Sequence, residues 1–324
     1  MMEKVAKTER LMAPVLNSMQ LRHLHSVLLA CFCESQEPDA DNDDDAKRCI
    51  EAFLSAKKLE GCSDRSLGYY ASALKRFAKC VGKRMGAVTT DDVRAYLSGY
   101  QEASGASNVT VDNIRRILSS FFSWLEEEDF IYKSPVKRIK KIRATKPVKP
   151  VYSDEVLEQL RDNCTELRDL AIVDLLASAG MRVGELVKLD RADVDLEGRE
   201  CIVHGKGSKE RRAYFDARTK VHLQSYLESR TDANPALFVS LNKPHNRLEI
   251  SGVECRLRAL GKKLDLPKVH PHKFRRTLAT KAIDKGMPIE QVQVLLGHSK
   301  IDTTLCYAMV DQENVKQSHR KFIS

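Results

Sequence analysis

The sequence lacks the patterns that mark disulfide-rich, zinc-binding or membrane proteins. Its nine cysteines are scattered, and only Cys31 and Cys33 lie close together. A disulfide framework needs paired cysteines and a tetrahedral zinc site needs two close ligand pairs, so we expect reduced thiols in a cytoplasm. The most apolar early window, Val27 to Phe32, is far shorter than the roughly 20 residues of a membrane span. Because the charged stretch from Met1 to Arg10 precedes no apolar core with a cleavage site, no signal peptide is predicted, and we expect a soluble protein.

A phosphate-binding nucleotide loop is also absent, although Gly205 to Lys209 reads Gly-Lys-Gly-Ser-Lys. Such a loop needs a glycine five residues before its Gly-Lys pair and Ser or Thr directly after the lysine. Glu200 and Gly207 occupy those two positions. We therefore expect a hairpin turn with an exposed Lys206 that could reach a DNA groove as a proton donor. The alternative is an ordinary basic turn, and no cofactor is expected.

Length and charge suggest two domains and a polyanionic partner. A chain of 324 residues is too long for one ordinary domain. Lys and Arg number 54 against 45 Asp and Glu, which gives a net charge of +9. This balance favours nucleic acid, and a merely solvated basic surface remains the alternative at this point.

The N-terminal half is predicted to be helical. Residues 1–45 read as a helical arm that ends in an acidic linker from Glu37 to Asp45; because acidic residues avoid DNA, we expect the arm to contact protein. Residues 46–132 read as a compact helical domain with Trp124 in its core. Its four helices are expected at 46–59, after an N-cap at Ser63, from Thr89 with Asp92 in a capping box, and from about Thr110.

Residues 133–150 read as a basic linker between the domains. The segment contains eight basic residues, no acidic residue and three prolines. Prolines keep a chain extended, and this basic density suits a strap along a phosphate backbone, with a solvated linker as the alternative. The candidate DNA-binding residues are Lys137, Arg138, Lys140, Lys141 and Arg143.

Residues 151–310 are predicted to form a second, mostly helical domain with one small antiparallel sheet. One helix should start after Ser153, and a buried helix should run from Leu167 to Ala179 and end at Gly180. The period changes to that of short strands at 193–196, 201–203 and 213–215. Helices are expected at 182–189, 219–229, 250–264, 273–285 and 288–296, and 311–324 reads as a tail helix. The fold class is therefore mainly α with a small antiparallel sheet.

Several residues of this domain suit the binding of a phosphate. Arg182 follows the Gly180 turn at the start of a helix, where backbone N–H groups favour an anion, and Glu185 could orient its guanidinium. A surface arginine and a solvated glutamate are the alternatives. His272 and Arg275 are three residues apart, hence on one helical face. The Tyr307 phenol has an ordinary pKa near 10, so as a nucleophile it would need cationic surroundings.

The histidines His270, His272 and His298 could suggest a metal site. No Glu or Cys lies in register to complete a ligand set, and the neighbouring Arg275 and Arg276 would oppose a cation. No metal is therefore expected.

Taken together, the motifs resemble those of the tyrosine recombinase (phage integrase) family, with a simple, Xer-like architecture. They are Arg182, Lys206, His272-Lys-Phe-Arg275, Leu-Leu-Gly-His298 and Tyr307. The resemblance covers residues 46 to about 310 and implies a SAM-like core-binding domain followed by a catalytic domain, which together clamp DNA. The family's usual histidine after the second arginine is Arg276 here, and Glu185 matches an acidic residue that commonly follows the first arginine.

The resemblance implies roles for these residues. Arg182 and Arg275 would clamp the scissile phosphate, His272 and His298 would hydrogen-bond its oxygens and assist proton transfer, and Lys206 would protonate the leaving 5′ oxygen. Tyr307 would attack phosphorus to give a 3′-phosphotyrosine, and Glu185 and Arg276 would support the site. The enzyme would recombine double-stranded DNA at core sites as a homotetramer on two sites, with room for an accessory directionality factor, in a bacterial-type cytoplasm at the nucleoid.

The same chemistry would serve integration or excision of a mobile element, inversion or dimer resolution. Two alternatives remain at this point. One is a type IB topoisomerase, which relaxes DNA without choosing a sequence, and the other is a DNA-binding protein that has lost catalysis. Every catalytic position holds a competent residue, which argues against the second.

Overall fold

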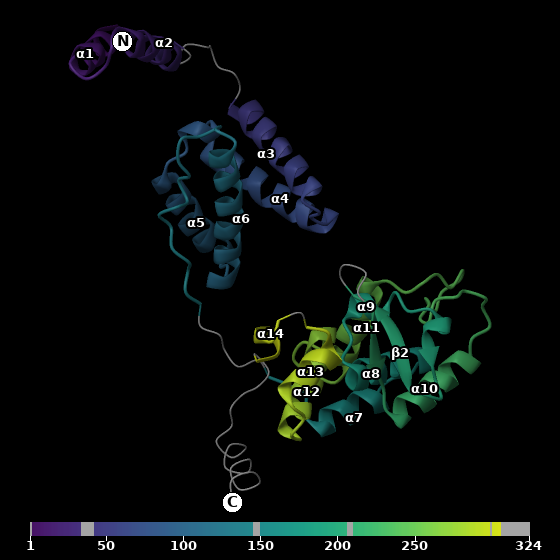
Figure 1. Cartoon of the computed structure of the whole chain (residues 1–324). Coiled ribbons are helices and arrows are strands. Elements are labelled where there is room, and N and C mark those ends of the chain that lie inside the picture. The colour runs from purple at the N-terminus through teal and green to yellow at the C-terminus, as the bar shows by residue number, and fades with distance from the viewer. Residues whose placement is uncertain (1, 34–41, 145–149, 206–209, 299, 306–324) are drawn as a thin grey trace, which may run out of the picture. The chain divides into compact units, whose positions relative to one another are not determined.

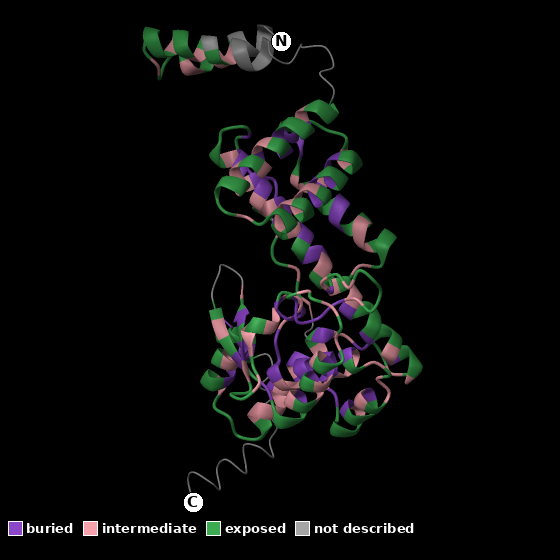
Figure 2. Cartoon of the chain, turned by 90° about the vertical axis from the view of Figure 1, so that its right-hand side faces the viewer, coloured by how far each residue is buried: buried purple, intermediate pink, exposed green. Residues whose placement is uncertain are grey.

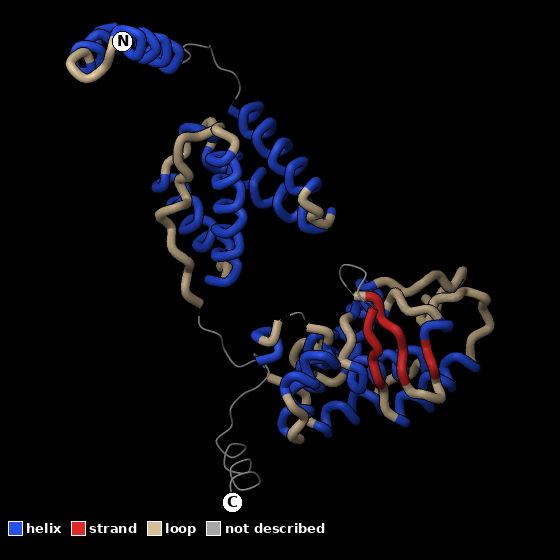
Figure 3. The backbone as a smooth tube through the Cα atoms, in the orientation of Figure 1, coloured by secondary structure: helices blue, strands red, loops and turns tan. Residues whose placement is uncertain are grey.

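The protein was analysed as a computed structural model that describes residues 2–33, 42–144, 150–205, 210–298 and 300–305 (Figure 1). Its contacts divide the chain into two compact units, Met1–Pro147 and Val148–Ser324. The expected tail helix at 311–324 lies outside the described residues. Most of the regular structure is helical, and the described strands form one small sheet in the second unit (Figure 3).

The first unit consists of helices whose starts are set by local capping. After α1 (Met2–Met12) and α2 (Ser18–Cys33) come α3 (Asn42–Leu59), α4 (Asp64–Val81), the short 3-10 helix η2 (Met85–Ala87), α5 (Thr90–Ser104) and α6 (Asn108–Glu127). The N-cap at Ser63 and the capping box between Thr89 and Asp92 are both present, as predicted. The α6 helix begins two residues earlier than expected, because Ser107 is its N-cap and accepts from the Thr110 backbone N–H.

Large apolar and aromatic side chains from α3 to α6 fill one core. Figure 2 marks the buried residues of the chain in purple. The ring of Phe53 packs edge-on against those of Phe121 and Trp124, with ring centroids 5.4 Å and 5.7 Å apart. The single tryptophan therefore belongs to this core, as predicted. Residues after α6 extend it: Val136 is buried, and Ile139 and Ile142 pack against it. The segment predicted as a basic interdomain linker is therefore, in its first part, attached to the helices.

The second unit surrounds a buried helix. Its helices are α7 (Asp154–Asp162), α8 (Leu167–Ala179), α9 (Val183–Leu186), α10 (Ala217–Glu228), α11 (Ile250–Lys263), α12 (Pro271–Asp284), α13 (Ile289–Leu296) and α14 (Asp302–Leu305), with the 3-10 turn η3 (Arg191–Asp193). The α8 helix packs against α7, α10, α12 and β3, and it ends at Gly180 as predicted. Its short successor is shorter than predicted, because α9 covers four residues rather than the expected 182–189.

The sheet is antiparallel, in the order β1 (Val194–Asp195), β2 (Glu200–His204) and β3 (Glu210–Tyr214). In the register of the hairpin, His204 pairs with Glu210 and Cys201 with Ala213. Cys201, Val203 and Ala213 are buried, so one face of the hairpin joins the core of the unit. The mainly helical fold with a small antiparallel sheet is confirmed.

Replacing Leu118 with alanine should destabilise the first unit. Leu118 is fully buried, so the substitution leaves a cavity and should lower the free energy of unfolding by about 2–5 kcal/mol. Trp124 is the only tryptophan and lies in the same core, so urea unfolding followed by its fluorescence reports on this unit. The control is Leu59→Ala, because Leu59 is 91% exposed and its loss should change the free energy by less than about 0.5 kcal/mol. Equal effects of the two substitutions would contradict the packing described.

Candidate active site

The C-terminal turn of α13 brings together three arginines that are far apart in the sequence. Each donates a hydrogen bond to a different one of three successive carbonyl oxygens: Arg211 to Leu295 at 2.9 Å, Arg275 to Leu296 at 2.6 Å and Arg182 to Gly297 at 3.4 Å. The last carbonyls of a helix have no partner within it and carry the negative end of its dipole. The end of α13 therefore holds guanidinium groups from α9, β3 and α12 close to one another.

Two glycines make this arrangement possible. Gly297 ends α13 with a φ of +65°, and a Cβ there would stand 2.6 Å from Cδ of Arg211. Gly180 ends α8 with a φ of +56°, and a Cβ there would stand 2.5 Å from Cδ2 of Leu278. Both positions therefore need glycine for the left-handed conformation and for the close approach of a side chain.

Arg182 is oriented by Glu185, as the sequence suggested. Nη1 of Arg182 donates to Oε1 of Glu185 at 2.8 Å, and its backbone N–H donates to Oε2 at 2.9 Å. Burial alone would raise the pKa of Glu185, but the backbone hydrogen bond from Arg182 and the charges of Arg211 and Arg182 outweigh it and hold that pKa below its usual value. Glu185 is therefore a buried carboxylate, whereas the Arg182 side chain keeps 41% of its surface exposed and can reach a ligand.

Arg211 is the member of the cluster that the sequence analysis missed. Its Nη2 donates to Oε2 of Glu185 at 2.8 Å, so one carboxylate joins two arginines. The sequence did contain a signal for it, because residues two apart in a strand lie on the same face of the sheet. In β3, Arg211 lies on the face of the buried Ala213, whereas Arg212 lies on the other face and donates to Glu200 at 2.8 Å. An arginine on the inward face of a strand needs a buried partner, and Glu185 is that partner.

Arg275 is held at both ends of its guanidinium. The side chain is 3% exposed, and Nη1 donates to the Gly180 carbonyl at 2.7 Å while Nη2 reaches Leu296. It lies on α12, which begins with Pro271 at its first turn after His270 as N-cap. The ends of α8 and α13 therefore fix this arginine in one orientation.

The two candidate histidines are both kept neutral near pH 7. Partial burial, together with the charges of Arg275 and Arg182, lowers the pKa of His272. Burial is also the largest cause for His298, and with the charges of Arg275, Arg182 and Arg211 it lowers the pKa of that group to about 4. His298 is 9% exposed, and its Nδ1 lies 2.8 Å from the Thr304 hydroxyl. Burial and the charges of Arg275 and Arg182 thus lower the pKa of both imidazoles.

Arg276 and His270 have other surroundings. Nη1 of Arg276 donates to the Pro150 carbonyl at 3.0 Å, which ties α12 to the start of the second unit. His270 caps α12, and burial followed by the charge of Arg276 lowers its pKa. The structure thus gives Arg276 a contact with the backbone near α7.

Lys206 and Tyr307 lie outside the described residues. Lys206 belongs to the stretch between β2 and β3, whose flanking residues His204 and Glu210 pair with each other. Tyr307 follows α14 in the sequence, which ends at Leu305. Four of the six predicted catalytic residues, namely Arg182, His272, Arg275 and His298, can therefore be placed.

The candidate DNA-binding residues of the first unit form an exposed basic strip. Val136, Ile139 and Ile142 recur every third residue and pack on the helical core, which leaves the cations between them outside. Asp112 fastens the strip by accepting from the Ile142 backbone N–H at 3.0 Å, and Asn108 donates to the Arg143 carbonyl at 2.9 Å. The exposed residues are Lys137, Arg138, Lys140, Lys141 and Arg143.

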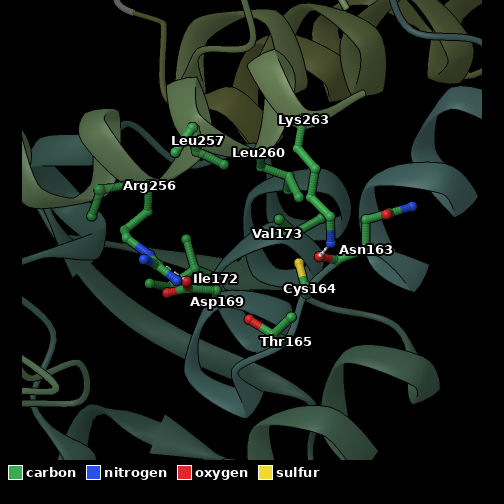
Figure 4. A pocket seen from close by; sticks show the side chains of 12 residues that line it. Asn163, Cys164, Thr165, Asp169, Ile172, Val173, Arg256, Leu257, Leu260 and Lys263 are labelled. Atoms are coloured by element: carbon green, nitrogen blue, oxygen red, sulfur yellow. Dashed lines mark hydrogen bonds and ion pairs between the residues drawn. The ribbon is translucent and has the colours of Figure 1, made fainter. Parts of the chain in front are cut away.

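A small hollow of about 180 Å³ lies between α8 and α11 (Figure 4). Apolar side chains such as Ile172 and Leu257 form its walls, and Arg256 donates to Asp169 at 2.6 Å at its edge. None of the candidate catalytic residues lines it.

No group of three His, Cys, Asp or Glu side chains among the described residues is placed to hold a metal ion. No described helix is long and apolar enough to cross a membrane.

Comparison with known protein families identifies both units. The phage integrase family matches residues 151–314, and the N-terminal SAM-like domain of phage integrases matches residues 49–131. The chain belongs to the phage integrase family. As a tyrosine recombinase of this family, it is an enzyme that cleaves and rejoins DNA at specific sites through a tyrosine. The first of these matches begins at residue 49, after α1 and α2.

Curated relatives carry the family likeness along most of the chain. The tyrosine recombinase XerC of Leptospira interrogans is 32% identical over 83% of this chain and 91% of its own length. XerC of Oceanobacillus iheyensis is 30% identical over 84% of this chain and 94% of its own length.

Solved structures show the same fold. The Tn1549 transposon integrase in complex with a circular intermediate DNA matches 84% of this chain and 98% of its own, with a TM-score of 0.68 and 19% identity. The XerH recombinase bound to a palindromic difH substrate matches 83% of each chain, with a TM-score of 0.67 and 21% identity.

The low pKa of His298 can be measured directly. Because its folded pKa is about 4, below the usual 6.5, His298 should stay neutral as the pH falls to about 5 and should gain its proton near pH 4. As the pH falls, the unfolded chain takes up this proton near pH 6.5, before the folded chain does so near pH 4. By linkage, the contribution of His298 to the free energy of unfolding is therefore complete above pH 6.5 and is lost towards pH 4. NMR titration of the imidazole without DNA, assigned with His298→Asn, tests this. A midpoint near 6.5 would contradict the buried, cationic surroundings.

Proposed function

We propose that Arg182, Arg275, His272 and His298 bind the scissile phosphate of the DNA. The two arginines would hold its non-bridging oxygens, since a guanidinium can donate two parallel hydrogen bonds to one phosphate. The two histidines, neutral near pH 7, would donate an N–H to a phosphate oxygen, and His272 would assist proton transfer. Glu185 would keep Arg182 in position. Arg276 would support the site through its bond to the backbone at Pro150.

We propose Tyr307 as the nucleophile and Lys206 as the general acid. The Tyr307 oxygen would attack phosphorus while the neutral imidazole of His272 takes the proton of the phenol, the bond from phosphorus to the 5′ oxygen would break, and Lys206 would give that oxygen a proton. The product is a 3′-phosphotyrosine, which keeps a phosphate ester bond. The freed 5′ hydroxyl of another strand can then attack it, so rejoining needs no external energy source.

The observation that best supports this proposal is the fixed arginine cluster at the end of α13. Charge that builds up on a pentacoordinate phosphorus is stabilised most by donors that are already oriented and need not reorganise. Arg275 is almost fully buried and bonded to Gly180 and Leu296, and Arg182 is bonded to Glu185 and Gly297. The remaining surface of Arg182 is where an anion can approach.

We propose that both units bind one DNA duplex at a core site, with the basic strip of residues 137–143 on its phosphates. Contacts of this kind provide affinity without choosing a sequence. The integrase and XerH structures that share this fold were solved on DNA. Integration, inversion and dimer resolution would all use this chemistry. These outcomes would differ only in how the two DNA sites are arranged. The working place would be the cytoplasm, at the nucleoid, with an accessory factor setting direction.

Replacing Tyr307 with phenylalanine should abolish cleavage and preserve binding. The variant lacks only the nucleophilic oxygen. In a gel-shift assay it should therefore bind duplex DNA as the wild type does, and it should form no covalent adduct. The assay uses a library of nicked duplexes, in which the short strand diffuses away after cleavage and traps the adduct. Arg275→Ala should lower the rate of adduct formation about a hundredfold or more, because a fixed donor is lost. Adduct retained by Tyr307→Phe would discard the assignment of the nucleophile.

The same experiment separates the alternatives. DNA recovered from the wild-type adducts should share a sequence, which identifies the core site. A type IB topoisomerase would instead form adducts without a shared sequence and relax an arbitrary plasmid. A binding protein without catalysis would form none.

We propose that the protein acts as a homotetramer on two DNA sites and that residues 311–324 contact a neighbouring protomer. The apolar positions Val315 and Phe322 of this segment would provide the contact. The double variant Val315→Glu, Phe322→Glu should still form adducts on single sites but should not bring two sites together in gel-shift and light-scattering measurements. Undiminished pairing of sites by this variant would sink the assignment of the tail.

A further inference from the structure

We infer that Arg211 is a positioning residue for the recombination reaction, which acts through Glu185 and the end of α13 to keep Arg182 oriented towards the phosphate. Arg211 is assigned this indirect role because both of its terminal nitrogens donate to groups that also hold Arg182, namely Glu185 and the turn at 295–297, and because 14% of its side chain is exposed, compared with 41% for Arg182. The inference rests on the proposed role of Arg182 as a phosphate ligand. It adds a residue that neither the motifs nor the comparisons assign.

The first argument is geometric. Arg211 spans two parts of the site, since Nη1 donates to the Leu295 carbonyl at 2.9 Å and Nη2 donates to Glu185 at 2.8 Å. Arg182 meets the same two parts through Glu185 and Gly297. The two arginines, the carboxylate and the turn at 295–297 therefore form one closed set of hydrogen bonds, and removing Arg211 opens it.

The second argument concerns charge. Glu185 is 5% exposed and accepts two hydrogen bonds from Arg182 and one from Arg211. If Arg211 were absent, the carboxylate would have only Arg182 as a cationic partner among these residues and would offset its charge. With two guanidinium groups on one carboxylate, the set keeps one net positive charge. Because Arg211 is buried, that charge is offered to an anion through the exposed side of Arg182.

The third argument is the close packing of Arg211 on the end of α13. The space that a Cβ on Gly297 would need is occupied by the Arg211 side chain, with Cδ at 2.6 Å and Nε at 2.7 Å. The turn that carries the Gly297 carbonyl, and leads directly to His298, thus rests on this side chain. A displacement of about 1 Å in such a support can cost about a hundredfold in rate.

The test compares Arg211→Gln, Arg211→Lys and the matched control Arg212→Gln in the full-length protein. Arg212 is the next residue of β3, is 65% exposed and pairs with Glu200 on the other face of the strand. Three quantities are measured: the Kd for the DNA recovered from wild-type adducts, the rate of adduct formation with enzyme in excess, and the thermal midpoint. Arg211→Gln should form adduct about ten to a hundred times more slowly with its Kd within about twofold of wild type. Arg212→Gln should match the wild type.

The lysine variant keeps the positive charge but cannot span both partners with a planar fork, so it should recover part of the rate. It also decides the matter if Arg211→Gln fails to fold. A second measurement tests the route through Glu185 with the double variant Glu185→Gln, Arg211→Gln. If both residues act through the same contacts, the rate of cleavage by the double variant should fall by less than the product of the two single reductions.

Wild-type rates in both Arg211 variants would overturn the inference, as would a weakened Kd with an unchanged rate on saturating DNA. Fully multiplicative effects of Glu185→Gln and Arg211→Gln would overturn the route through Glu185. These outcomes differ from a failure of the proposed function, in which the wild type itself forms no adduct.

Discussion

The site depends on three successive carbonyl groups at the end of α13, those of Leu295, Leu296 and the C-cap residue Gly297, each of which accepts a hydrogen bond from a different arginine. The donors come from β3, α12 and the start of α9, so one helix end sets the relative positions of three elements. Since the carbonyls are successive, a slip of α13 by one residue would misplace all three guanidinium groups together. Gly297 is what allows the chain to turn there without displacing Arg211.

The same set of bonds determines the electrostatics. Three arginines and one buried carboxylate leave a net positive charge. Burial is the larger cause of the low histidine pKa values, and this positive charge adds to it, so that the pKa of His298 is about 4 and that of His272 lies below its usual value. The site therefore combines permanent cations with neutral imidazoles. Such a site provides fixed donors, which suit the stabilisation of charge on a phosphate.

Local signals in the sequence were sufficient for much of this arrangement. The end of α8 at Gly180, the start of α9 at Arg182 and the β2–β3 hairpin were all predicted, because glycine turns, caps and strand alternation are read within a few residues. The pairing of Arg182 with Glu185 was predicted for the same reason, since the two residues are one helical turn apart. The three-residue offset of His272 and Arg275 likewise placed both on the first turns of α12.

Non-local contacts could not be read in this way. Arg211 lies 26 residues from Glu185 and 84 from Leu295, and only the packing of β3 beside α9 and α13 unites them. The attachment of residues 133–144 to the first unit was hidden for another reason. Their high charge and prolines suggested an extended interdomain strap, whereas three apolar side chains among the cations anchor them to the helical core of the first unit.

That anchoring affects how the protein can hold DNA. A basic strip fastened by Asp112 and Asn108 presents its cations on a fixed surface, so fewer chain conformations are lost when phosphates bind. Its members are nonetheless unequal, because Lys137 already donates to Glu126 at 3.3 Å and must share its charge with that carboxylate. Strip contacts of this kind supply affinity that falls with salt but do not read bases. In the proposed function, affinity from the first unit and chemistry from the arginine cluster of the second would thus be separate properties, carried by different residues of the same chain.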